Sequence, residues 1–346
     1  MTAALPAHVW RHDAVPIEAL LAAKERGGHR VSVVIPARDE EDSVGAVVAA
    51  VRAAWVDQVG LVDELVVIGA LEAQTVTDRE LVVIDSDSVD ATAERAADAG
   101  ATVCAASSVR DDLGPAQGKG EALWKALHVT TGDLLLFLDA DLVDWGPHFV
   151  PGLLAPLLTR PDVQLVKAVY HRPHLDAEGN EVEAGGRVTE LVARPILALH
   201  FPELAHVVQP LSGEWAIRRV AFERMSVPVG YGVEIAALVD TCAVHGPDAI
   251  AQVDLGRRTH RHHRHDTLGP MAVQVLAAVE RRLGERTDGD AVVIPLRQFA
   301  PVNGGFEEAV RHVDVAERPP AVDIRGYRSA SFGPDWLNED DRGWRR

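Results

Sequence analysis

The sequence predicts an α/β protein built on a mostly parallel sheet with helices on both faces. Strand-like and helix-like segments alternate over the first 145 residues, and the apolar strands are continuous rather than interleaved with polar residues. Parallel strands need crossover connections, usually helical, and strands covered on both faces have few polar positions. We expect a smaller second part and a helical C-terminal region to complete the chain.

The first expected strand is Val31–Ile35, which follows a polar N-terminal arm, residues 1–30, that we expect to lie on the main body. Apolar positions between 44 and 55 recur at helical spacing, and the acidic residues just before them complement the positive end of a helix. A strand, a turn and a helix therefore follow one another, as in the repeating unit of a parallel sheet.

Two near-copies of one strand come next, at 63–68 and 79–84. Only the second copy runs into a polar turn and a helical pattern, at 91–99. We therefore place the second copy centrally in the sheet, treat the first as an edge strand, and interpret residues 69–80 as an insertion.

The first half of the chain closes with strands at 101–105 and 134–138, joined through a glycine turn at 114–120 and a helix at 121–128. Ligands of parallel sheets bind at the carboxyl ends of the strands, so the polar residues after each strand are the candidate site. Beyond residue 145 the patterns predict one strand and three helices, at 163–170, 188–199, 229–242 and 271–283.

The charge of the chain excludes some classes of protein. With 34 Lys and Arg against 52 Asp and Glu, the formal charge is −18, which argues against binding to nucleic acid or to an anionic membrane. No basic segment precedes an apolar run at the N-terminus, and no apolar stretch reaches the ~18 residues of a membrane span. We expect a soluble, cytoplasmic protein whose two cysteines are reduced.

Two motifs can bind a diphosphate together with a cation. Asp139-Ala-Asp141 ends a buried strand, where carboxylates can hold a hard divalent ion, although the same acids can simply cap a turn. Lys119 is one of only four lysines and lies between Gly118 and Gly120 at a helix start. Its ammonium and the backbone N–H groups of the turn suit a phosphate, without the spacing of a P-loop.

Other candidates lie in the second half. The run 259–265 holds four histidines, of which one could join Asp141 on a metal, while a solvated basic loop explains the others. Arg187, just ahead of Thr189 at a helix start, can bind an anion or can be an exposed capping residue. Glu234 lies beside a glycine turn, where a carboxylate can hold sugar hydroxyls or cap a helix.

These residues carry a resemblance to a known family. The sequence resembles the actinobacterial glucosyl-3-phosphoglycerate synthases, which are retaining GT-A glycosyltransferases, and shares much with the related mannosyl-3-phosphoglycerate synthases. The likeness covers roughly residues 8–300, and its segments occur in the family's order: VSVVIPARDEE, VVIDSDSVDAT, GKGEALWKAL, LLLFLDADL, QLVKAVYHRP, GGRVTELVARP, QPLSGE, GYGVEI and DAIAQVDLG.

The resemblance implies a GT-A type, Rossmann-like fold and assigns roles to particular residues. By this resemblance the nucleotide sugar would be bound by Pro36, Ala37, Glu40, Ser86, Lys119 and Asp139. The metal, Mg²⁺ or Mn²⁺, would be held by Asp141 and His260. The acceptor would be bound by Arg187, Thr189, Tyr231 and His262. Catalysis would depend on Asp139, Asp141, Lys119, Leu211 and Glu234. Glu234 would hold hydroxyls of the donor sugar, and the carbonyl of Leu211 would lie near the reacting anomeric carbon.

The activity implied is transfer of glucose from a nucleoside diphosphate glucose, with UDP-glucose favoured, to the 2-hydroxyl of 3-phosphoglycerate with retention. Mannosyl transfer from GDP-mannose is the nearest alternative, and a degenerate sugar-nucleotide-binding protein is an alternative of another class. Nucleotidyl transfer is disfavoured because its glycine-rich turn would directly follow the first strand, which here runs into Pro-Ala-Arg-Asp.

The expected division of the chain combines these patterns with the resemblance, which also implies a homodimer. Its parts are an N-terminal arm (1–30), a nucleotide-sugar-binding half (31–145), an acceptor-binding half (146–265), a C-terminal helical region for dimerisation (266–313) and a polar, flexible tail (314–346).

Overall fold

A computed structural model describes most of the chain. The described residues are 9–57, 59–69, 83–84, 90–141, 146–171, 173–175, 181–183, 186–257, 265–287, 291–302 and 305–327. Ser86, His260 and His262, and nearly all of the expected insertion at 69–80, lie outside the described residues.

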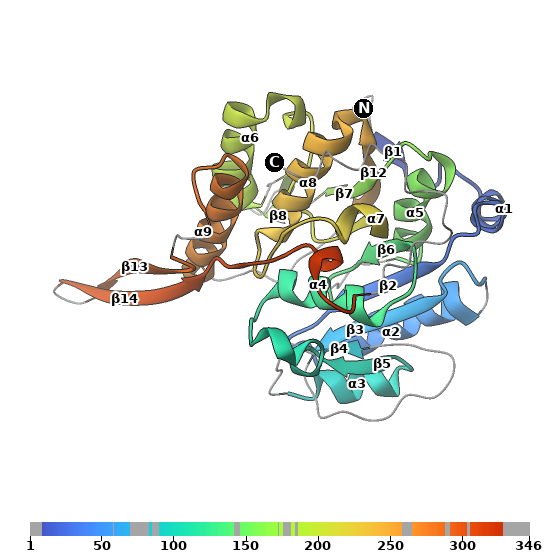
Figure 1. Cartoon of the computed structure of the whole chain (residues 1–346), viewed down its shortest axis with the longest axis horizontal. Coiled ribbons are helices and arrows are strands. Elements are labelled where there is room, and N and C mark those ends of the chain that lie inside the picture. Colours follow the sequence, from blue (N-terminus) through green and yellow to red (C-terminus); the bar gives the residue numbers. More distant parts are fainter. Residues whose placement is uncertain are drawn as a thin grey trace.

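One sheet runs through the molecule (Figure 1). Its strands, in spatial order, are β1 (Val9–Arg11), β12 (Ile250–Arg257), β7 (Leu165–His171), β10 (Trp215–Arg218), β6 (Leu134–Phe137), β2 (Val31–Pro36), β3 (Glu64–Gly69) and β4 (Val83–Ile84), with β5 (Thr102–Ala105) also paired to β3. Only β10 runs antiparallel to its neighbours, β6 and β7. The predicted mostly parallel sheet is confirmed, and strands from both halves of the chain share it.

Helices cover both faces of this sheet because successive strand residues point to opposite sides. On one face, Val33 belongs to a core that includes α1 (Ile17–Gly27), α2 (Val44–Val51) and α5 (Phe149–Thr159). On the other, Val34 belongs to a core built from α4 (Lys119–Val129), α8 (Val233–His245) and α9 (His265–Arg282). The shorter helices are α3 (Thr92–Asp98), α6 (Arg194–His200) and α7 (Arg219–Phe222).

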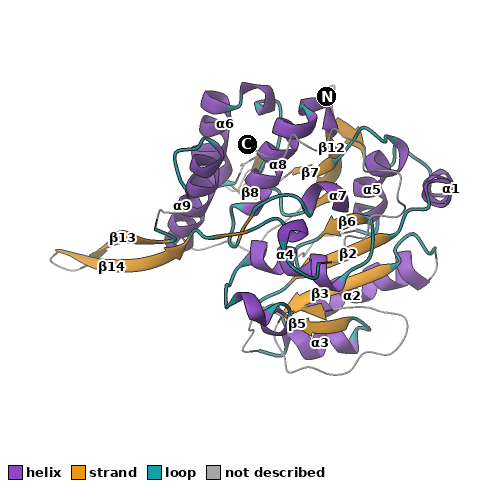
Figure 2. Cartoon of the chain, in the orientation of Figure 1, coloured by secondary structure: helices purple, strands orange, loops and turns teal. Residues whose placement is uncertain are grey.

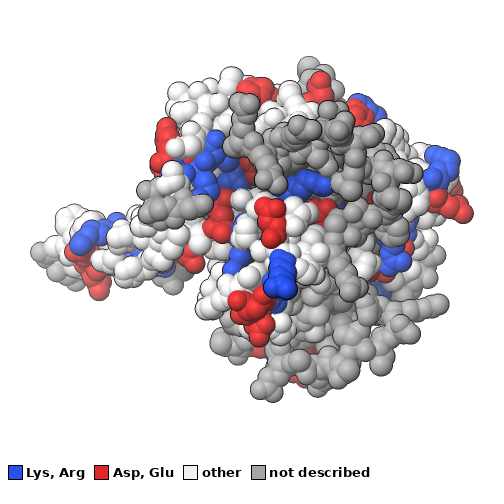
Figure 3. Space-filling view, viewed as in Figure 1, with Lys and Arg blue, Asp and Glu red and all other residues white. Residues whose placement is uncertain are grey.

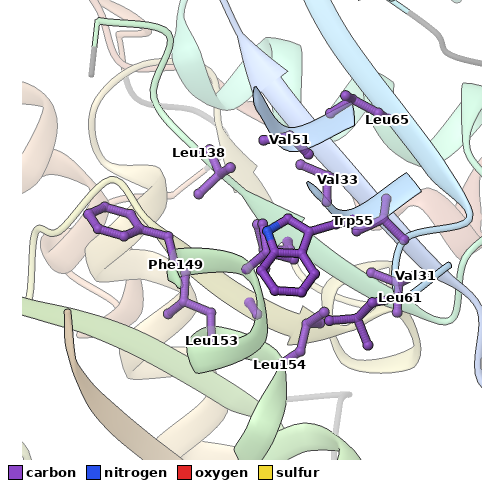
Figure 4. Packing of buried hydrophobic residues seen from close by; sticks show 14 of the residues in the cluster. Val31, Val33, Val51, Trp55, Leu61, Leu65, Leu138, Phe149, Leu153 and Leu154 are labelled. Atoms are coloured by element: carbon purple, nitrogen blue, oxygen red, sulfur yellow. The ribbon is translucent and has the colours of Figure 1, made fainter. Parts of the chain in front are cut away.

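The first of these cores is centred on Trp55 (Figure 4). This indole lies on a π-helical turn, Arg52–Asp57, which continues α2, and only 8% of the residue is exposed. Aliphatic side chains of the sheet and of α5 surround it, among them Val33 and Leu154. Truncating such a residue to alanine typically costs about 3–5 kcal/mol, so this contact fixes α2 against the sheet.

The prediction that the first strand copy is an edge strand is wrong. This copy forms β3, which pairs with β2 from Ser32↔Glu64 to Pro36↔Ile68, and the described residues of the second copy, β4, pair with its other edge. A buried carboxylate accompanies this pairing: Glu64 accepts hydrogen bonds from the Ser32 hydroxyl (2.5 Å) and the Thr131 N–H (2.9 Å). Both donors are distant in sequence, so the apolar pattern alone could not distinguish the copies.

The N-terminal arm is part of the sheet rather than an element laid on it. Its strand β1 pairs in parallel with β12, with Val9 opposite Gln252 and Arg11 opposite Asp254. The helix α1 contributes Leu20, which is fully buried, to the main core. Lys24 ties α1 to the body through the Gly60 carbonyl (2.9 Å).

The C-terminal region is only partly helical. The expected helix is present as α9, but a β-hairpin follows it, made of β13 (Val293–Val302) and β14 (Gly305–Asp314), and it projects from the body (Figures 1 and 2). A small pair, β8 (Pro173–Leu175) and β9 (Glu181–Glu183), and the pair β11 (Val227–Pro228) with β15 (Glu317–Arg318) complete the strands of the described residues.

The expected flexible tail is wrong for its first part. Residues 315–327 pack on the body: Ala321 is fully buried, and the Tyr327 hydroxyl donates to the Glu223 carboxylate (2.8 Å). Two of its charged side chains, Glu317 and Arg318, form ion pairs with the buried side chains of Arg282 and Glu121. The later residues of the tail lie outside the described part of the chain.

Two further features concern the cysteines and the helices. Cys104 is half-buried, Cys242 is buried, and both are free thiols. In the described part of the chain, no helix is long and apolar enough to cross a membrane.

Candidate active site

Three of the predicted site residues meet at the carboxyl ends of the central strands. Lys119 is the first residue of α4, Asp139 follows β6, and Glu234 lies in the first turn of α8. The Lys119 Nζ atom lies 2.6 Å from Asp139 Oδ1 and 2.8 Å from Glu234 Oε1. Residues from three elements thus form one cluster of a cation between two carboxylates.

This cluster keeps Lys119 charged. Burial acts to lower the pKa of the ammonium, but Asp139 and Glu234 outweigh it and hold the pKa well above its usual value. A permanent, fixed cation at a strand end is the arrangement that stabilises negative charge on a bound diphosphate.

Gly213 explains how a loop approaches this cluster. A Cβ atom at Gly213 would lie 2.1 Å from Asp139 Oδ2 and 2.6 Å from Lys119 Nζ. Contacts this short do not occur, so any side chain here would displace the two charged groups. Gly213 is therefore a residue of the site that a search for charged side chains does not find.

The loop before Gly213 holds Leu211, and a buried lysine fixes it. The Ser212 N–H donates to the Gln209 carbonyl (3.1 Å), and Lys167 Nζ donates to the Ser212 carbonyl (2.8 Å). Burial lowers the pKa of Lys167 to about 7. Sequence reasoning missed Lys167, although a lysine inside the apolar strand Leu165–His171 is a visible signal.

The glycine turn before α4 differs from the expectation in one respect. The N–H groups of Gly120 and Glu121 donate to the carbonyls of Gly230 (3.3 Å) and Val229 (2.8 Å). These two groups are therefore not open to a phosphate, and Lys119 contributes through its ammonium. The glycines permit close packing instead, since a Cβ at Gly120 would lie 1.8 Å from the Pro228 carbonyl oxygen.

Tyr231 lies beside the same cluster. Its phenol is within electrostatic range of Lys119, Asp139, Glu234 and Asp141, and 44% of the residue is exposed. Its N–H donates to the Gln274 side-chain oxygen (3.0 Å), which ties this loop to α9. A partly exposed aromatic residue next to buried charges is suited to contact a substrate.

Arg187 and Thr189 lie at the start of the helical segment that leads to α6, and the turn that Thr189 begins packs against α9. Arg187 is exposed, and Thr189 begins a π-helical turn, Thr189–Ala193, rather than a regular α-helix. The Glu190 N–H donates to the Gly186 carbonyl (2.9 Å), so this turn is closed by its own backbone.

The residues predicted for the nucleoside follow β2. Pro36 ends the strand, and Ala37 is 3% exposed, so its methyl group packs in the core and only its backbone can meet a ligand. Glu40 accepts a hydrogen bond from the Ser43 hydroxyl (2.9 Å), and its N–H donates to Thr92 Oγ1 (2.7 Å). Glu40 therefore links the starts of α2 and α3.

The fit of a divalent cation depends on the carboxylates after β6. Asp139 and Asp141 supply hard oxygen ligands, and the missing Cβ of Gly213 leaves space at Asp139 Oδ2. Among the described residues, no group of three or more His, Cys, Asp or Glu side chains is arranged to hold a metal. The expected second ligand, His260, lies outside these residues.

Comparison with known proteins places this geometry in a family. Residues 32–222 match the model of glycosyl transferase family 2. The glucosyl-3-phosphoglycerate synthase of Mycolicibacterium smegmatis is 42% identical over 318 residues, which cover 92% of this chain and 97% of that protein.

Two crystal structures of the Mycobacterium tuberculosis glucosyl-3-phosphoglycerate synthase share the fold. Their TM-scores are 0.78 and 0.76, each at 40% identity over 93% of this chain and 100% of theirs. The first holds Mn²⁺, UDP and phosphoglyceric acid, and the second holds Mn²⁺, UDP-glucose and phosphoglyceric acid. The chain therefore belongs to glycosyl transferase family 2, as a GT-A-fold member of the glucosyl-3-phosphoglycerate synthases.

Proposed function

We propose that this protein transfers glucose from UDP-glucose to the 2-hydroxyl of 3-phosphoglycerate with retention of anomeric configuration. The observation that carries the proposal is Lys119 held between Asp139 and Glu234 at the carboxyl ends of the central strands. The cluster offers a cation for the diphosphate and carboxylates for a sugar, on a chain 42% identical to a named synthase.

The chemistry is mostly electrostatic. Negative charge develops on the departing UDP, and a cation already in place lowers the barrier because it needs no reorganisation during the reaction. Lys119 supplies that cation, and Glu234 accepts hydrogen bonds from the donor sugar. A bound Mg²⁺ or Mn²⁺, held by Asp141 and His260, would add Lewis-acid neutralisation of the diphosphate.

Positive charge develops at the anomeric carbon as the bond to UDP breaks. A carbonyl oxygen near that carbon stabilises it, and the proposed group is the Leu211 carbonyl. Lys167 holds the next carbonyl, that of Ser212, so the loop is fixed before the substrates arrive. The acceptor would be held by Arg187, Thr189, Tyr231 and His262, with Arg187 facing its phosphate.

The deciding experiment offers the purified protein 3-phosphoglycerate with UDP-, GDP- and ADP-sugars in turn. We expect glucosyl-3-phosphoglycerate from UDP-glucose, identified by mass, with the anomeric configuration read by NMR. Product from GDP-mannose alone would establish the mannosyl alternative. Binding of sugar nucleotides without any product would establish a catalytically inactive binding protein.

The metal proposal has its own test. We expect excess EDTA to abolish turnover and Asp141→Asn to remove most of it, because an amide is a poor substitute for a carboxylate on a hard cation. His260→Ala should weaken metal use more than the matched change His263→Ala. Full activity in EDTA would contradict the proposal.

The acceptor proposal concerns Arg187. A guanidinium bound to a phosphate makes charge-assisted hydrogen bonds, and their loss typically costs about 2–4 kcal/mol. Arg187→Ala should therefore raise the KM for 3-phosphoglycerate far more than the KM for UDP-glucose. A KM effect confined to UDP-glucose would move Arg187 to the donor site.

We also propose a homodimer that uses the projecting hairpin. Residues of β13 and β14 that lie on the face opposite α9 are exposed, with Phe299 at 62%, Phe306 at 75% and Val310 at 45%. The other face packs on α9 through Leu296 and Val313. Large apolar side chains on a two-stranded ribbon favour association with a second copy.

Charged residues of both signs accompany these apolar side chains along the hairpin (Figure 3). We expect Phe306→Asp to lower the molar mass measured by light scattering from that of a dimer to that of a monomer. Arg311 provides the control: it is half-buried and lies opposite Leu296 on the face toward α9, and Arg311→Gln removes its charge there without changing the apolar face. A monomeric wild-type protein would contradict the proposal.

The functional labels of the two halves and the cytoplasmic location stay predictions.

A further inference from the structure

The chain segment after the hairpin, residues 314–319, passes beside the active-site loops, and we call it the C-terminal strap. The Val229 N–H donates to the Ala316 carbonyl (3.0 Å), and β15 pairs with β11, Val227 opposite Arg318. The strap therefore adds a strand to the loop that leads to Tyr231 and Glu234. Nothing in the transfer chemistry itself requires this segment.

Arg318 of the strap contacts residues at both ends of the glycine turn, residues 114–120, which contains Lys119. Its Nε and Nη2 atoms lie 2.7 and 2.8 Å from the two carboxylate oxygens of Glu121. The same guanidinium donates to the carbonyls of Leu113 (2.9 Å) and Gly114 (2.8 Å). One side chain thus closes the turn from Leu113 to Glu121.

This contact is buried, and few other residue types could make it. The side chains of Arg318 and Glu121 are 11% and 2% exposed, and Arg318 also lies over the Trp124 ring, 5.6 Å from its centroid. A planar fork that binds a carboxylate and two carbonyls together is specific to arginine, because lysine presents a single point charge.

The turn held in this way sets the position of the Lys119 ammonium. On its other side, the turn packs against Val229 and Gly230 through the glycine contacts described above. Lys119 lies within this turn, as the first residue of α4, so displacement of the turn moves the cation relative to Asp139. Misplacing a catalytic group by about 1 Å can cost about 100-fold in rate.

We propose that Arg318 is a positioning residue for the donor diphosphate, acting through the glycine turn that it closes. This inference rests on the proposed function, since it names how the cation for the departing UDP is held. Arg318 itself would contact neither substrate. Its loss should weaken the donor site and spare the acceptor site.

The test compares Arg318→Lys and Arg318→Met with the wild-type protein by steady-state kinetics, with each substrate varied in turn. Tyr327→Phe is the matched control, because it removes a hydrogen bond of the same packed segment, to Glu223, without touching the turn. UDP affinity is measured in parallel by calorimetry, which does not depend on turnover.

We expect Arg318→Met to lower kcat/KM for UDP-glucose about 10- to 100-fold and to raise the KM for UDP-glucose, with the KM for 3-phosphoglycerate within about twofold of wild type. Arg318→Lys should recover part of this effect, and Tyr327→Phe should change neither KM. Equal effects on both KM values, or the same donor effect in Tyr327→Phe, would overturn the proposal and leave Arg318 a general structural residue.

The test still decides if a variant does not fold or if the wild-type protein is inactive. If Arg318→Met does not fold, Glu121→Gln weakens the same contact from the other partner and should give the same donor-specific change. If the wild-type protein shows no transferase activity, the proposed function fails. UDP affinity then still decides the role of Arg318: a drop in the lysine variant supports it, and unchanged affinity overturns it.

Discussion

Two buried clusters in this protein each hold one basic side chain between an aspartate and a glutamate, but their surroundings differ. In the active site, Lys119 lies between Asp139 and Glu234. Near the C-terminal strap, Arg282 lies between Asp240 (2.8 Å) and Glu317 (2.8 Å). In each case burial acts to lower the pKa of the cation, and two carboxylates raise it above its usual value.

The difference lies in the remaining donors. Arg282 also donates to the carbonyls of Ala278 and Ser226, both at 2.9 Å, so it joins α9, α8 and the strap permanently. Within the described part of the chain, the carboxylates of Asp139 and Glu234 are the partners of Lys119, which leaves one of its three N–H groups for a ligand. The arginine cluster is closed by hydrogen bonds to backbone carbonyls, whereas the lysine cluster keeps a donor for the proposed substrate.

The largest expected effect is on stability, in Arg282→Met. Removing one partner from a buried ion pair leaves uncompensated charges and typically costs about 3–5 kcal/mol. We expect that loss in the free energy of unfolding, measured with urea, while turnover per folded molecule stays close to wild type. A large fall in turnover without a loss of stability would break the distinction between the clusters.

Lys119→Met should lower turnover strongly and stability less, the opposite of the result expected for Arg282→Met. Removing one preorganised charge-stabilising group typically lowers turnover by about 100- to 1000-fold, or about 3–4 kcal/mol. We expect a smaller loss of stability than in Arg282→Met, because Lys119 joins fewer segments. Rate assays measure turnover, and urea unfolding of the same preparations measures the free energy of unfolding. Turnover retained at the wild-type level would show that Lys119 has no part in the mechanism.

Lys167 sharpens the comparison as a buried cation whose hydrogen bond goes to a carbonyl. Its folded pKa of about 7 is below the usual 10.5, so between these values the unfolded chain binds more protons. Wild-type stability should therefore rise with pH from about 7 to 10.5, relative to Lys167→Met. Parallel curves for the two proteins across this range would show that Lys167 does not titrate as a buried amine.

His128 should give the smallest effect, on the acid side. Burial lowers the pKa of its imidazole to about 4, below the usual 6.5. The unfolded chain therefore binds the extra proton first, and stability falls as the pH drops from about 6.5 to 4. Thermal unfolding should show a weaker fall in His128→Gln, and equal slopes would contradict the assignment.

Sequence patterns predicted the parts of this molecule that depend on local periodicity. The alternation of strands and helices identified the sheet, and the rule that ligands bind at strand ends brought Lys119 and Asp139 into one site. Patterns failed where a distant partner decides the outcome. Glu64 of β3 is buried against Ser32 of β2, and no local feature of either strand copy shows that the first is the one flanked on both sides.

The same reason explains the missed residues of the site. Gly213 matters because it meets Asp139, and Arg318 matters because it meets a turn about 200 residues earlier in the chain. A polar, proline-containing segment such as 314–327 resembles a flexible tail until its partners are known. The roles assigned to Ser86, His260 and His262 stay predictions.

The pairing of β1 with β12 bears on how the chain is made. Arg11 emerges early from the ribosome, but its partner Asp254 follows about 240 residues later, at roughly 5–20 residues per second. The first strand must therefore wait roughly 10–50 seconds, with its edge unpaired, before the sheet can close. An N-terminal fusion partner that keeps this strand extended in solution should raise the yield of folded protein.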